Sequence, residues 1–371
     1  MSEECLRYEL EHVDEPGFIE KAWCQVEQVA NVSFFLSWQW ISCWMEVMKP
    51  DLHLCSVYTK DRLIGLGLFV SCDLKRHRFL SVKQLRLHST GLEACDQIWP
   101  EYNGMLVESG YEALVYSGLV PFLESAPLEW DEFVIGPLDK GVIDIVNCSS
   151  TTPLTIWQAP TYRVNLRSLH AGKSSFLESI SKNTRQQIRR SIRHYEKKGG
   201  LSFTKARSPK EARQYFDAIG ILHKQRWNKE SGFCNHRFIQ FHHQLIEMNF
   251  HCGSIELLKL EVAGDVVGYL YNFVFRNKVL FYLSGLDCVV ENKLKPGLVL
   301  HSLSIQTHLD NGDEEYDFLG GDARYKRSLA LKSDNIEIVL YQKRIAKLIL
   351  EQKLRRVKQT AQAFARITTG D

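Results

Sequence analysis

One stretch, residues 279–326, constrains the fold more than any other part of the chain. Residues 279–284 (VLFYLS) read as a buried apolar strand, and residues 316–319 (YDFL) read as a second, shorter strand. Between them, leucines and isoleucines recur at helical spacing after Pro296, until Gly312 supplies a helix stop. Strand, helix and strand in this order predict a parallel crossover unit, and ligands bind at the carboxyl ends of such strands.

The start of this helix is a candidate site for the phosphates of a donor molecule. Pro296 suits the first helical turn, where its missing N–H would be unpaired in any case. A glycine next to it leaves the neighbouring backbone N–H groups open to an anion, and two nearby lysines add positive charge. We therefore assign donor binding to Lys293, Lys295, Gly297 and Leu298. The alternative is an ordinary Pro-Gly helix start.

The chain of 371 residues is long for a single core, which favours two domains. The predicted order of helix, three strands, helix and strand occurs in both halves, and this order indicates a duplication. The predicted parts are an N-terminal lobe (1–150), a C-terminal catalytic domain (151–335) and a basic C-terminal helix (336–371). The polar, proline-punctuated segment 149–160 is a plausible linker between the lobes.

Charge divides unevenly between the two halves. Residues 1–150 hold 11 Lys/Arg and 23 Asp/Glu, a net of −12, whereas residues 151–371 hold 35 and 21, a net of +14. This asymmetry predicts an anionic ligand on the C-terminal side, unless the halves simply complement each other across their interface.

The ten cysteines form no CxxC pair, and we find neither a signal peptide nor an apolar run long enough to span a bilayer. We expect a cytoplasmic protein.

Several motifs of the second half together resemble one family. They are SKNTRQQIRRSIRHYEKKG (181–199), LHKQRW (222–227), LSGLD (283–287), KPGLVL (295–300) and YDFLGGDARYK (316–326). Their combination resembles the CelD-like acetyltransferases of the GNAT superfamily, which are related to the FemAB peptidyltransferases. The resemblance implies an α/β (α+β) fold of two tandem GNAT-like lobes, each a mixed, mostly antiparallel sheet flanked by helices. We expect the first lobe to be non-catalytic, because its counterpart of GGDARYK around Gly136–Asp139 has no Tyr–Lys pair.

The same resemblance implies N-acyl transfer from acetyl-CoA or another acyl-CoA to a glycan or cell-envelope precursor, as in exopolysaccharide biosynthesis. The usual pyrophosphate loop of the superfamily is not intact, since residues 292–297 keep a single glycine. Two alternatives therefore stay open. One is a FemAB-like transferase that takes its acyl group from aminoacyl-tRNA, and the other is a non-catalytic GNAT-like binding protein.

Acyl transfer to an amine needs a proton acceptor, stabilisation of a tetrahedral oxyanion and a proton for the leaving thiolate. Tyr325 is a neutral donor that could supply the last, and Lys326 could stabilise the developing charge. Asp322 or Asp287 could accept the proton, and His223 is a further candidate base. The alternative is an Asp–Lys surface pair beside a packed tyrosine and a structural histidine. No cysteine or serine lies in a nucleophile motif, which favours direct attack.

Basic residues on two predicted helices are candidates for acceptor binding. Arg185, Arg189 and Arg193 recur once per turn, and Arg226 and Trp227 lie one turn after His223. One hypothesis is that these residues bind an anionic acceptor, such as a nucleotide sugar or a lipid-linked sugar diphosphate. If the chain is instead a FemAB-like transferase, they would bind the phosphate backbone of a tRNA. The other reading is a solvated charged face.

The segment from Tyr341 to Arg366 reads as a helix with eight basic residues and one acidic residue. Such a helix could lie peripherally on an anionic membrane, or dock on the protein with its basic side in solvent. Histidines and cysteines show no metal-ligand spacing, so we predict no metal site.

Overall fold

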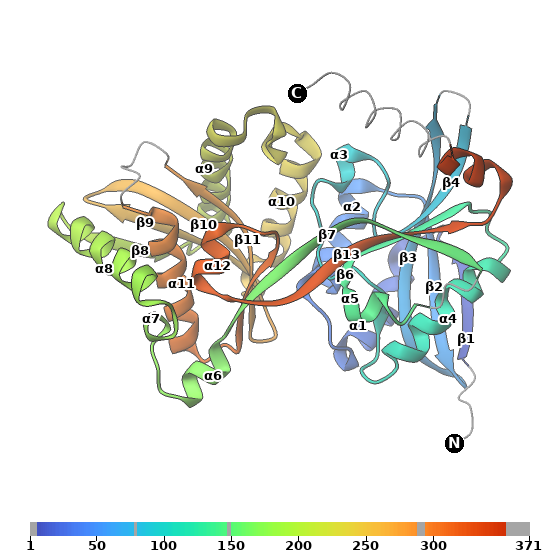
Figure 1. Cartoon of the computed structure of the whole chain (residues 1–371), viewed down its shortest axis with the longest axis horizontal. Coiled ribbons are helices and arrows are strands. Elements are labelled where there is room, and N and C mark those ends of the chain that lie inside the picture. The colour runs from blue at the N-terminus through green and yellow to red at the C-terminus, as the bar shows by residue number, and fades with distance from the viewer. Residues whose placement is uncertain (1–5, 78–79, 147–149, 288–293, 354–371) are drawn as a thin grey trace, which may run out of the picture.

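The computed structural model describes residues 6–77, 80–146, 150–287 and 294–353, and it has two α/β lobes joined by one sheet (Figure 1). The strands of the N-terminal lobe are β1 (Leu6–His12), β2 (Leu52–Thr59), β3 (Arg62–Arg76), β4 (Leu80–Leu87), β5 (Leu106–Val107) and β6 (Glu132–Asp139). Those of the C-terminal lobe are β8 (Leu201–Lys205), β9 (Ile255–Val262), β10 (Asp265–Phe275), β11 (Lys278–Leu286) and β12 (Glu315–Gly320). The prediction of two lobes with mixed, mostly antiparallel strands is confirmed.

Two long strands, β7 (Thr151–Asn165) and β13 (Leu331–Lys343), cross between the lobes (Figure 1). They pair antiparallel with each other, and β13 also pairs with β6 while β7 also pairs with β12. The full strand order is therefore β1-β2-β3-β4-β6-β13-β7-β12-β11-β10-β9-β8, with β5 added to β3. Strand β13, from the second half of the chain, thus extends the sheet of the first lobe.

The crossing of β7 and β13 between the lobes corrects two predictions. The segment expected to be a linker, 149–160, lies in β7 from residue 151 onward, and residues 336–343 of the expected C-terminal helix lie in β13. Helix begins only at residue 346 and is described to residue 353. The sequence of β7 predicts a linker because it contains Pro153 and Pro160, and because its strand partner β13 lies far away in sequence.

Helices cover both faces of the sheet. In the N-terminal lobe they are α1 (Ile19–Val29), α2 (Trp38–Met48), α3 (Glu93–Asp96), α4 (Glu112–Ser125) and α5 (Lys140–Ile143). In the C-terminal lobe they are α6 (Leu166–Ala171), α7 (Phe176–Ser179), α8 (Lys182–Lys197), α9 (Pro209–Trp227), α10 (His236–Asn249), α11 (Pro296–Asn311) and α12 (Arg324–Leu329). The helix predicted between Pro296 and Gly312 is confirmed as α11.

One apolar core is shared by both lobes and fixes their arrangement. It contains buried side chains from α1 and α2 of the first lobe and from α9 and α10 of the second. Phe34 stacks on Phe273 with 4.5 Å between ring centroids, and Trp40 meets Phe241 edge-on at 4.7 Å. Burial of such aromatic pairs is strongly stabilising. The lobes are therefore held together at the junction where the cavities described below open.

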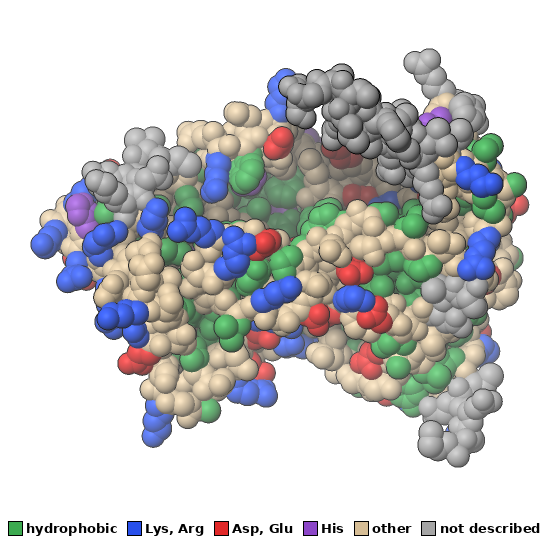
Figure 2. All heavy atoms as spheres, viewed as in Figure 1, with side chains coloured by type: hydrophobic (Ala, Val, Ile, Leu, Met, Phe, Trp, Pro, Cys, Tyr) green, Lys and Arg blue, Asp and Glu red, His purple; other side chains and the backbone are tan. Residues whose placement is uncertain are grey.

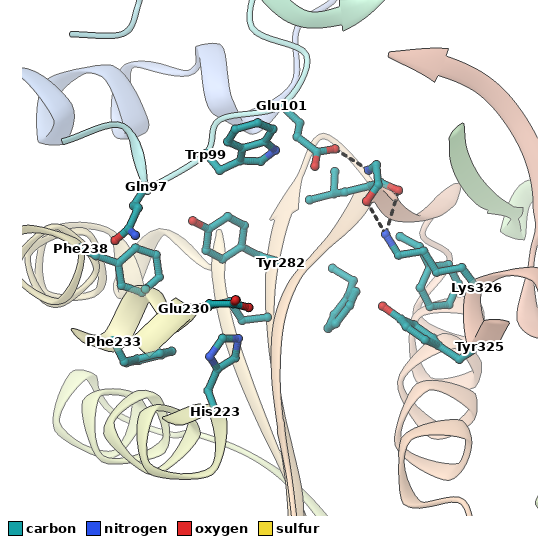
Figure 3. Close-up of a pocket in the computed structure, with 16 residues that line it drawn as sticks. Gln97, Trp99, Glu101, His223, Glu230, Phe233, Phe238, Tyr282, Tyr325 and Lys326 are labelled. Carbon is teal, nitrogen blue, oxygen red and sulfur yellow. Dashed lines mark hydrogen bonds between the residues drawn. The ribbon is translucent and has the colours of Figure 1, made fainter. Parts of the chain in front are cut away.

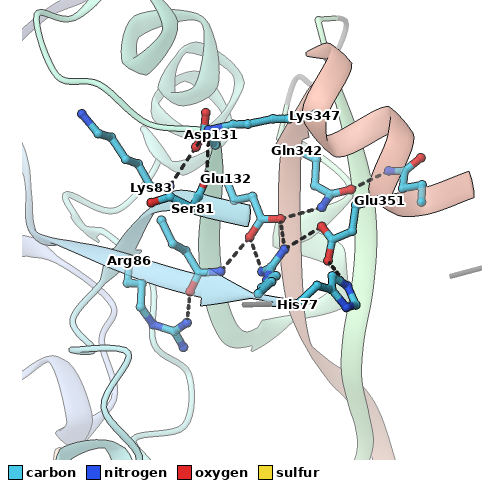
Figure 4. Close-up of polar contacts among 12 residues, drawn as sticks. His77, Ser81, Lys83, Arg86, Asp131, Glu132, Gln342, Lys347 and Glu351 are labelled. Atoms are coloured by element: carbon cyan, nitrogen blue, oxygen red, sulfur yellow. Dashed lines mark hydrogen bonds and ion pairs between the residues drawn. The ribbon is translucent and has the colours of Figure 1, made fainter. Parts of the chain in front are cut away.

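A buried polar network seats residues 346–353 on the N-terminal lobe (Figure 4). Arg76 donates to both carboxylate oxygens of Glu132, at 2.8 and 2.7 Å, and to Glu351 at 3.2 Å. The Glu132 and Glu351 side chains are only 0% and 2% exposed. The amides of Gln84 and Gln342 also donate to Glu132. One guanidinium thus forms ion pairs with two buried carboxylates from distant parts of the chain.

Replacing Arg76 by methionine should lower the free energy of unfolding by about 3–5 kcal/mol, because it removes one partner of a buried ion pair. Urea unfolding of the variant measures this effect. Lys75→Met is the matched control, since Lys75 is exposed and lies next to Arg76. A loss below about 1 kcal/mol, the range of a surface pair, would contradict the assignment.

Candidate active site

The predicted strand–helix–strand unit is present, and its two parallel strands diverge. Strands β11 and β12 pair only over Lys278–Leu280 and Glu315–Asp317. Beyond that point β11 runs on to Leu286, paired with β10 on its other edge only. The divergence leaves an open edge of β11 at the carboxyl ends of the parallel pair, where a ligand with amide groups could add like a strand.

Both diverging strands are irregular where they part. In the β10–β11 ladder Tyr271 pairs with Leu283 and Asn272 with Phe281, so that Tyr282 is the extra residue of a bulge. In β12, Leu319 has a positive φ of 60°, which is unusual for a residue with a side chain. Bulges and strained residues next to a cleft re-aim side chains and backbone groups, and they are common at functional sites.

Two cavities open on either side of this divergence and share part of their walls. The larger holds about 890 Å³ and lies toward α8, α11 and α12, and the smaller holds about 320 Å³ and lies between the lobes. The shared wall consists of His223, Phe281, Tyr282, Leu283, Gly320, Tyr325 and Lys326. We call them the larger cavity and the junction cavity.

Glu101 of the N-terminal lobe reaches into this shared wall (Figure 3). Its side chain is 5% exposed, and a carboxylate oxygen accepts a 2.6 Å hydrogen bond from the Gly320 N–H. A Cβ at position 320 would lie 3.3 Å from both carboxylate oxygens, so the glycine permits this close approach. Burial raises the pKa of Glu101, which the Gly320 N–H and the nearby Lys326 only partly oppose. A carboxylate with a raised pKa is suited to accept a proton.

Lys326 stabilises the strained end of β12. Its ammonium donates to the carbonyl oxygens of Leu319 and Gly320, at 3.2 and 2.6 Å. Burial lowers the pKa of Lys326, against the raising effect of Glu101 and Asp317. Two of its three N–H groups are thus engaged, and the third remains for a ligand in the wall.

Tyr325 lies beside Lys326 in the shared wall (Figure 3). Its ring stacks on His301 of α11, with 5.3 Å between centroids and 11° between planes. Burial raises the pKa of Tyr325, so the hydroxyl keeps its proton at neutral pH. The stacked ring holds a neutral O–H donor where the two cavities meet.

His223 and Arg226 project from α9, which packs tightly on β11. A Cβ at Gly285 of β11 would lie 2.8 Å from the Ile219 Cα, so only glycine permits this packing. His223 lines both cavities, and its Nδ1 lies 2.8 Å from the Ser231 hydroxyl. Burial, and then Arg226, lower the pKa of His223, so its imidazole is neutral at pH 7. Arg226 and Trp227 line the larger cavity.

The two aspartates proposed as bases are placed less favourably. Asp322 lines the larger cavity, but its carboxylate accepts from Tyr162 and Arg327. The hydrogen bond from Tyr162, followed by the contact with Arg327, lowers the pKa of Asp322. Asp287 is half-buried just after β11 and lines neither cavity.

The residues assigned to the donor lie at the start of α11, with one exception. Lys295 and Leu298 line the larger cavity. Gly297 lies between them in sequence, and a Cβ there would approach Leu286 at 3.1 Å. Lys293 lies outside the described residues.

The arginine stripe of α8 does not line the larger cavity. Asn183 and Gln187, one turn apart, line it instead. Residues 184, 188, 191 and 195 form the buried face of the helix, and the exposed Arg189 and Arg193 lie on the side away from Asn183 and Gln187. Figure 2 shows Lys and Arg side chains spread over this end of the C-terminal lobe. The stripe therefore forms an outer surface of the lobe, and Arg185, Arg189 and Arg193, which were expected to bind the acceptor, line neither cavity.

Sequence reasoning missed the contribution of the first lobe. Gln97, Trp99 and Glu101 line the junction cavity from the segment after α3. Nothing in the WPEYNG run marks a functional residue, and its proximity to the second lobe arises only from the shared core.

The equivalent divergence in the first lobe is filled by its own chain. Strands β4 and β6 are parallel and pair only over Gln84–Arg86 and Glu132–Val134. Beyond that point the Asn103 amide donates to the carbonyls of Leu87 and Gly136, at 3.0 and 3.3 Å. The side chain thus bridges the two strands where a ligand would otherwise lie.

Within the described part of the chain, no group of three or more His, Cys, Asp or Glu side chains could hold a metal ion. None of the described helices is long and apolar enough to cross a membrane.

Comparison with known proteins agrees with this architecture. Residues 182–327 match the family model of the acetyltransferase (GNAT) domain. That range contains the diverging strands, α11 and the start of α12. No curated protein sequence matches the chain.

Solved structures resemble nearly the whole chain. The crystal structure of FemX matches 93% of this chain and 99% of its own, with a TM-score of 0.59 at 10% identity. A conserved protein of unknown function from Bacteroides thetaiotaomicron VPI-5482 matches 91% and 100%, with a TM-score of 0.54 at 10% identity. L-PGS from Bacillus licheniformis matches 93% and 97%, with a TM-score of 0.52 at 10% identity. At 10% sequence identity these similarities show a shared fold and nothing more.

Proposed function

We propose that this chain, whose residues 182–327 match the acetyltransferase (GNAT) domain model and whose fold resembles that of FemX, is a transferase that passes an acyl group from acyl-CoA directly to a primary amine. The observation that carries this proposal is the position of Glu101. This buried carboxylate with a raised pKa lines the junction cavity at the diverging strand ends, and it contacts Gly320 in the wall that the junction cavity shares with the larger, cationic cavity. That arrangement suits a base placed between a donor and an acceptor.

The larger cavity has the charge that a CoA donor requires. Arg226, Lys295, Arg324 and Lys326 line it, and the carboxylate that also lines it, Asp322, is already paired with Arg327. Anionic phosphates would meet the lysine and the helix start at α11. The amides of the pantetheine chain would pair with the open edge of β11. Such binding directs the thioester toward the shared wall.

The reaction then proceeds without a covalent enzyme intermediate. The amine nitrogen attacks the thioester carbonyl, and Glu101 accepts the proton that the nitrogen loses. The remaining N–H of Lys326 stabilises the oxyanion of the tetrahedral intermediate. As the carbon–sulfur bond breaks, Tyr325 donates its proton to the leaving thiolate, and the proton on Glu101 later restores the tyrosine. His223 is neutral and could assist as a second acceptor.

Several finer assignments belong to this proposal. The N-terminal lobe (1–150) would have no active site of its own, because Asn103 occupies its strand divergence, but it would contribute Glu101 as the base to the active site of the second lobe. The acceptor implied by the family resemblance is an amine of a glycan or exopolysaccharide precursor. The protein would act in the cytoplasm, with its basic C-terminal segment at the inner face of the membrane.

A second candidate keeps the same site and takes the acyl group from aminoacyl-tRNA. The exposed arginines of α8 favour it, since they form a cationic outer surface on which a nucleic acid backbone could lie. If aminoacyl-tRNA is the donor, Arg189→Glu should weaken binding of the tRNA, whereas binding of acyl-CoA should be unaffected.

Leu298→Trp should reduce acetyl-CoA affinity at least about tenfold, because the indole would fill the larger cavity beside Lys295. Calorimetric titration with acetyl-CoA measures the affinity directly. Thr307→Trp is the matched control, since it places the same side chain at an exposed position of α11 outside the cavity. Equal affinities of the two variants would place the donor elsewhere, and no binding by the unmodified protein to any acyl-CoA would favour the tRNA donor.

A further inference from the structure

The junction cavity differs in chemistry from the larger cavity, although the two share a wall. Aromatic rings dominate its lining, including Trp99, Phe233, Phe238 and Tyr282. Its acidic side chains are Glu101 and Glu230, and its one Lys or Arg side chain is Lys326 of the shared wall. The larger cavity, by contrast, has four basic side chains and one acidic side chain, Asp322, which is already paired.

The two carboxylates lie on different sides of the junction cavity (Figure 3). Glu101 enters from the N-terminal lobe beside Lys326, and Glu230 lies near His223 and Tyr282. No hydrogen bond or ion pair joins the Glu230 carboxylate to another described residue. His223 is neutral at pH 7 because burial lowers its pKa, so it does not offset that charge.

Aromatic faces attract cations, and carboxylates attract them further, whereas an acidic wall repels phosphates and carboxylates. A volume of about 320 Å³ is at the low end for ligand pockets, and it admits a small molecule rather than a polymer segment.

We propose that the acceptor is a small primary amine of net positive charge, with no phosphate or carboxylate group. Its reacting nitrogen lies at Glu101, and a second hydrogen-bond donor, an ammonium or a hydroxyl, binds Glu230. Glu230 is a specificity-determining residue that selects cationic over anionic acceptors. This inference rests on the proposed acyl transfer, and it replaces the anionic acceptor that the basic composition of the second half suggested.

Matched acceptor pairs test the charge preference. Acetyl transfer from acetyl-CoA is measured with cadaverine against 6-aminohexanoate, and with glucosamine against glucosamine 6-phosphate. The wild type should prefer the cationic member of each pair by at least about tenfold in kcat/KM. Glu230→Lys should lower kcat/KM for cadaverine at least about tenfold and leave that for 6-aminohexanoate unchanged or higher. Glu247→Lys makes the same charge change on the exposed face of α10 and should change neither value.

Preference for the anionic members, or an unchanged ratio in Glu230→Lys, would overturn the inference. A second measurement tests the acceptor inference even if the proposed donor is wrong. Calorimetric binding of cadaverine without any donor should be at least about tenfold weaker in Glu230→Lys than in the wild type. If acetyl transfer is absent but this difference is found, the donor assignment fails and the acceptor inference holds. If cadaverine does not bind the wild type, the acceptor inference fails.

Discussion

Glu101→Gln should lower kcat by about 100- to 10,000-fold, the range of a lost general base. Glutamine keeps the size of the side chain, and its amide oxygen can still accept the Gly320 N–H. The substitution thus removes the proton acceptor while the packing at the junction remains. Steady-state acetyl transfer to an amine measures the effect, and Glu93→Gln, at an exposed position of α3, is the control.

The pH profile distinguishes a base from a merely structural carboxylate. Burial raises the pKa of Glu101, so kcat/KM of the wild type should fall as the pH drops through that raised pKa. Glu101→Gln should lack this acidic limb. The same shift means that the folded state favours protonated Glu101, and its contribution to stability is lost as the pH rises through the folded pKa. The variant should therefore be no less stable than the wild type at pH 8. A variant that retains both activity and the acidic limb would contradict the assignment.

Tyr325→Phe should lower kcat by about 100-fold, because the leaving thiolate loses its proton donor. The phenyl ring can keep its stacking on His301, so the affinity for acetyl-CoA should stay within about twofold of the wild type. A lower kcat with an unchanged dissociation constant for acetyl-CoA would indicate that Tyr325 donates a proton, because a packing role would change the affinity as well.

Tyr269→Phe provides the comparison, since Tyr269 belongs to the same lobe and lines neither cavity. It should leave kcat unchanged. If Tyr325→Phe has the same activity as this control, another group protonates the thiolate, and the assignment of Tyr325 is wrong.

The sequence predicts the local architecture well where the pattern is strong. The crossover unit of β11, α11 and β12 follows from an apolar strand, a Pro-Gly helix start and a glycine stop. Tyr325 and Lys326 lie at the cleft because they follow the end of a parallel strand, a position that topology fixes. Local patterns thus predict the architecture of the C-terminal lobe and part of the candidate site.

Nonlocal pairing is what the sequence does not reveal. Strand β7 is exposed over several residues and contains two prolines, so that only its distant partner β13 identifies it as a strand. Glu101 lies in a loop of the other lobe, and its role arises from burial against Gly320. The basic pattern of α8 is visible in sequence, but which face turns toward a cavity depends on how the helix packs.

In the proposed mechanism the diverging ends of β11 and β12 hold an acyl-CoA thioester between Glu101 and Tyr325. A crystal structure with a CoA analogue whose thioester is replaced by an unreactive ketone would show this arrangement. We expect the phosphates at Lys295 and the α11 start, the pantetheine along the open edge of β11, and the carbonyl within hydrogen-bond reach of the shared wall. An analogue bound outside this cleft, with the divergence empty, would contradict the mechanism.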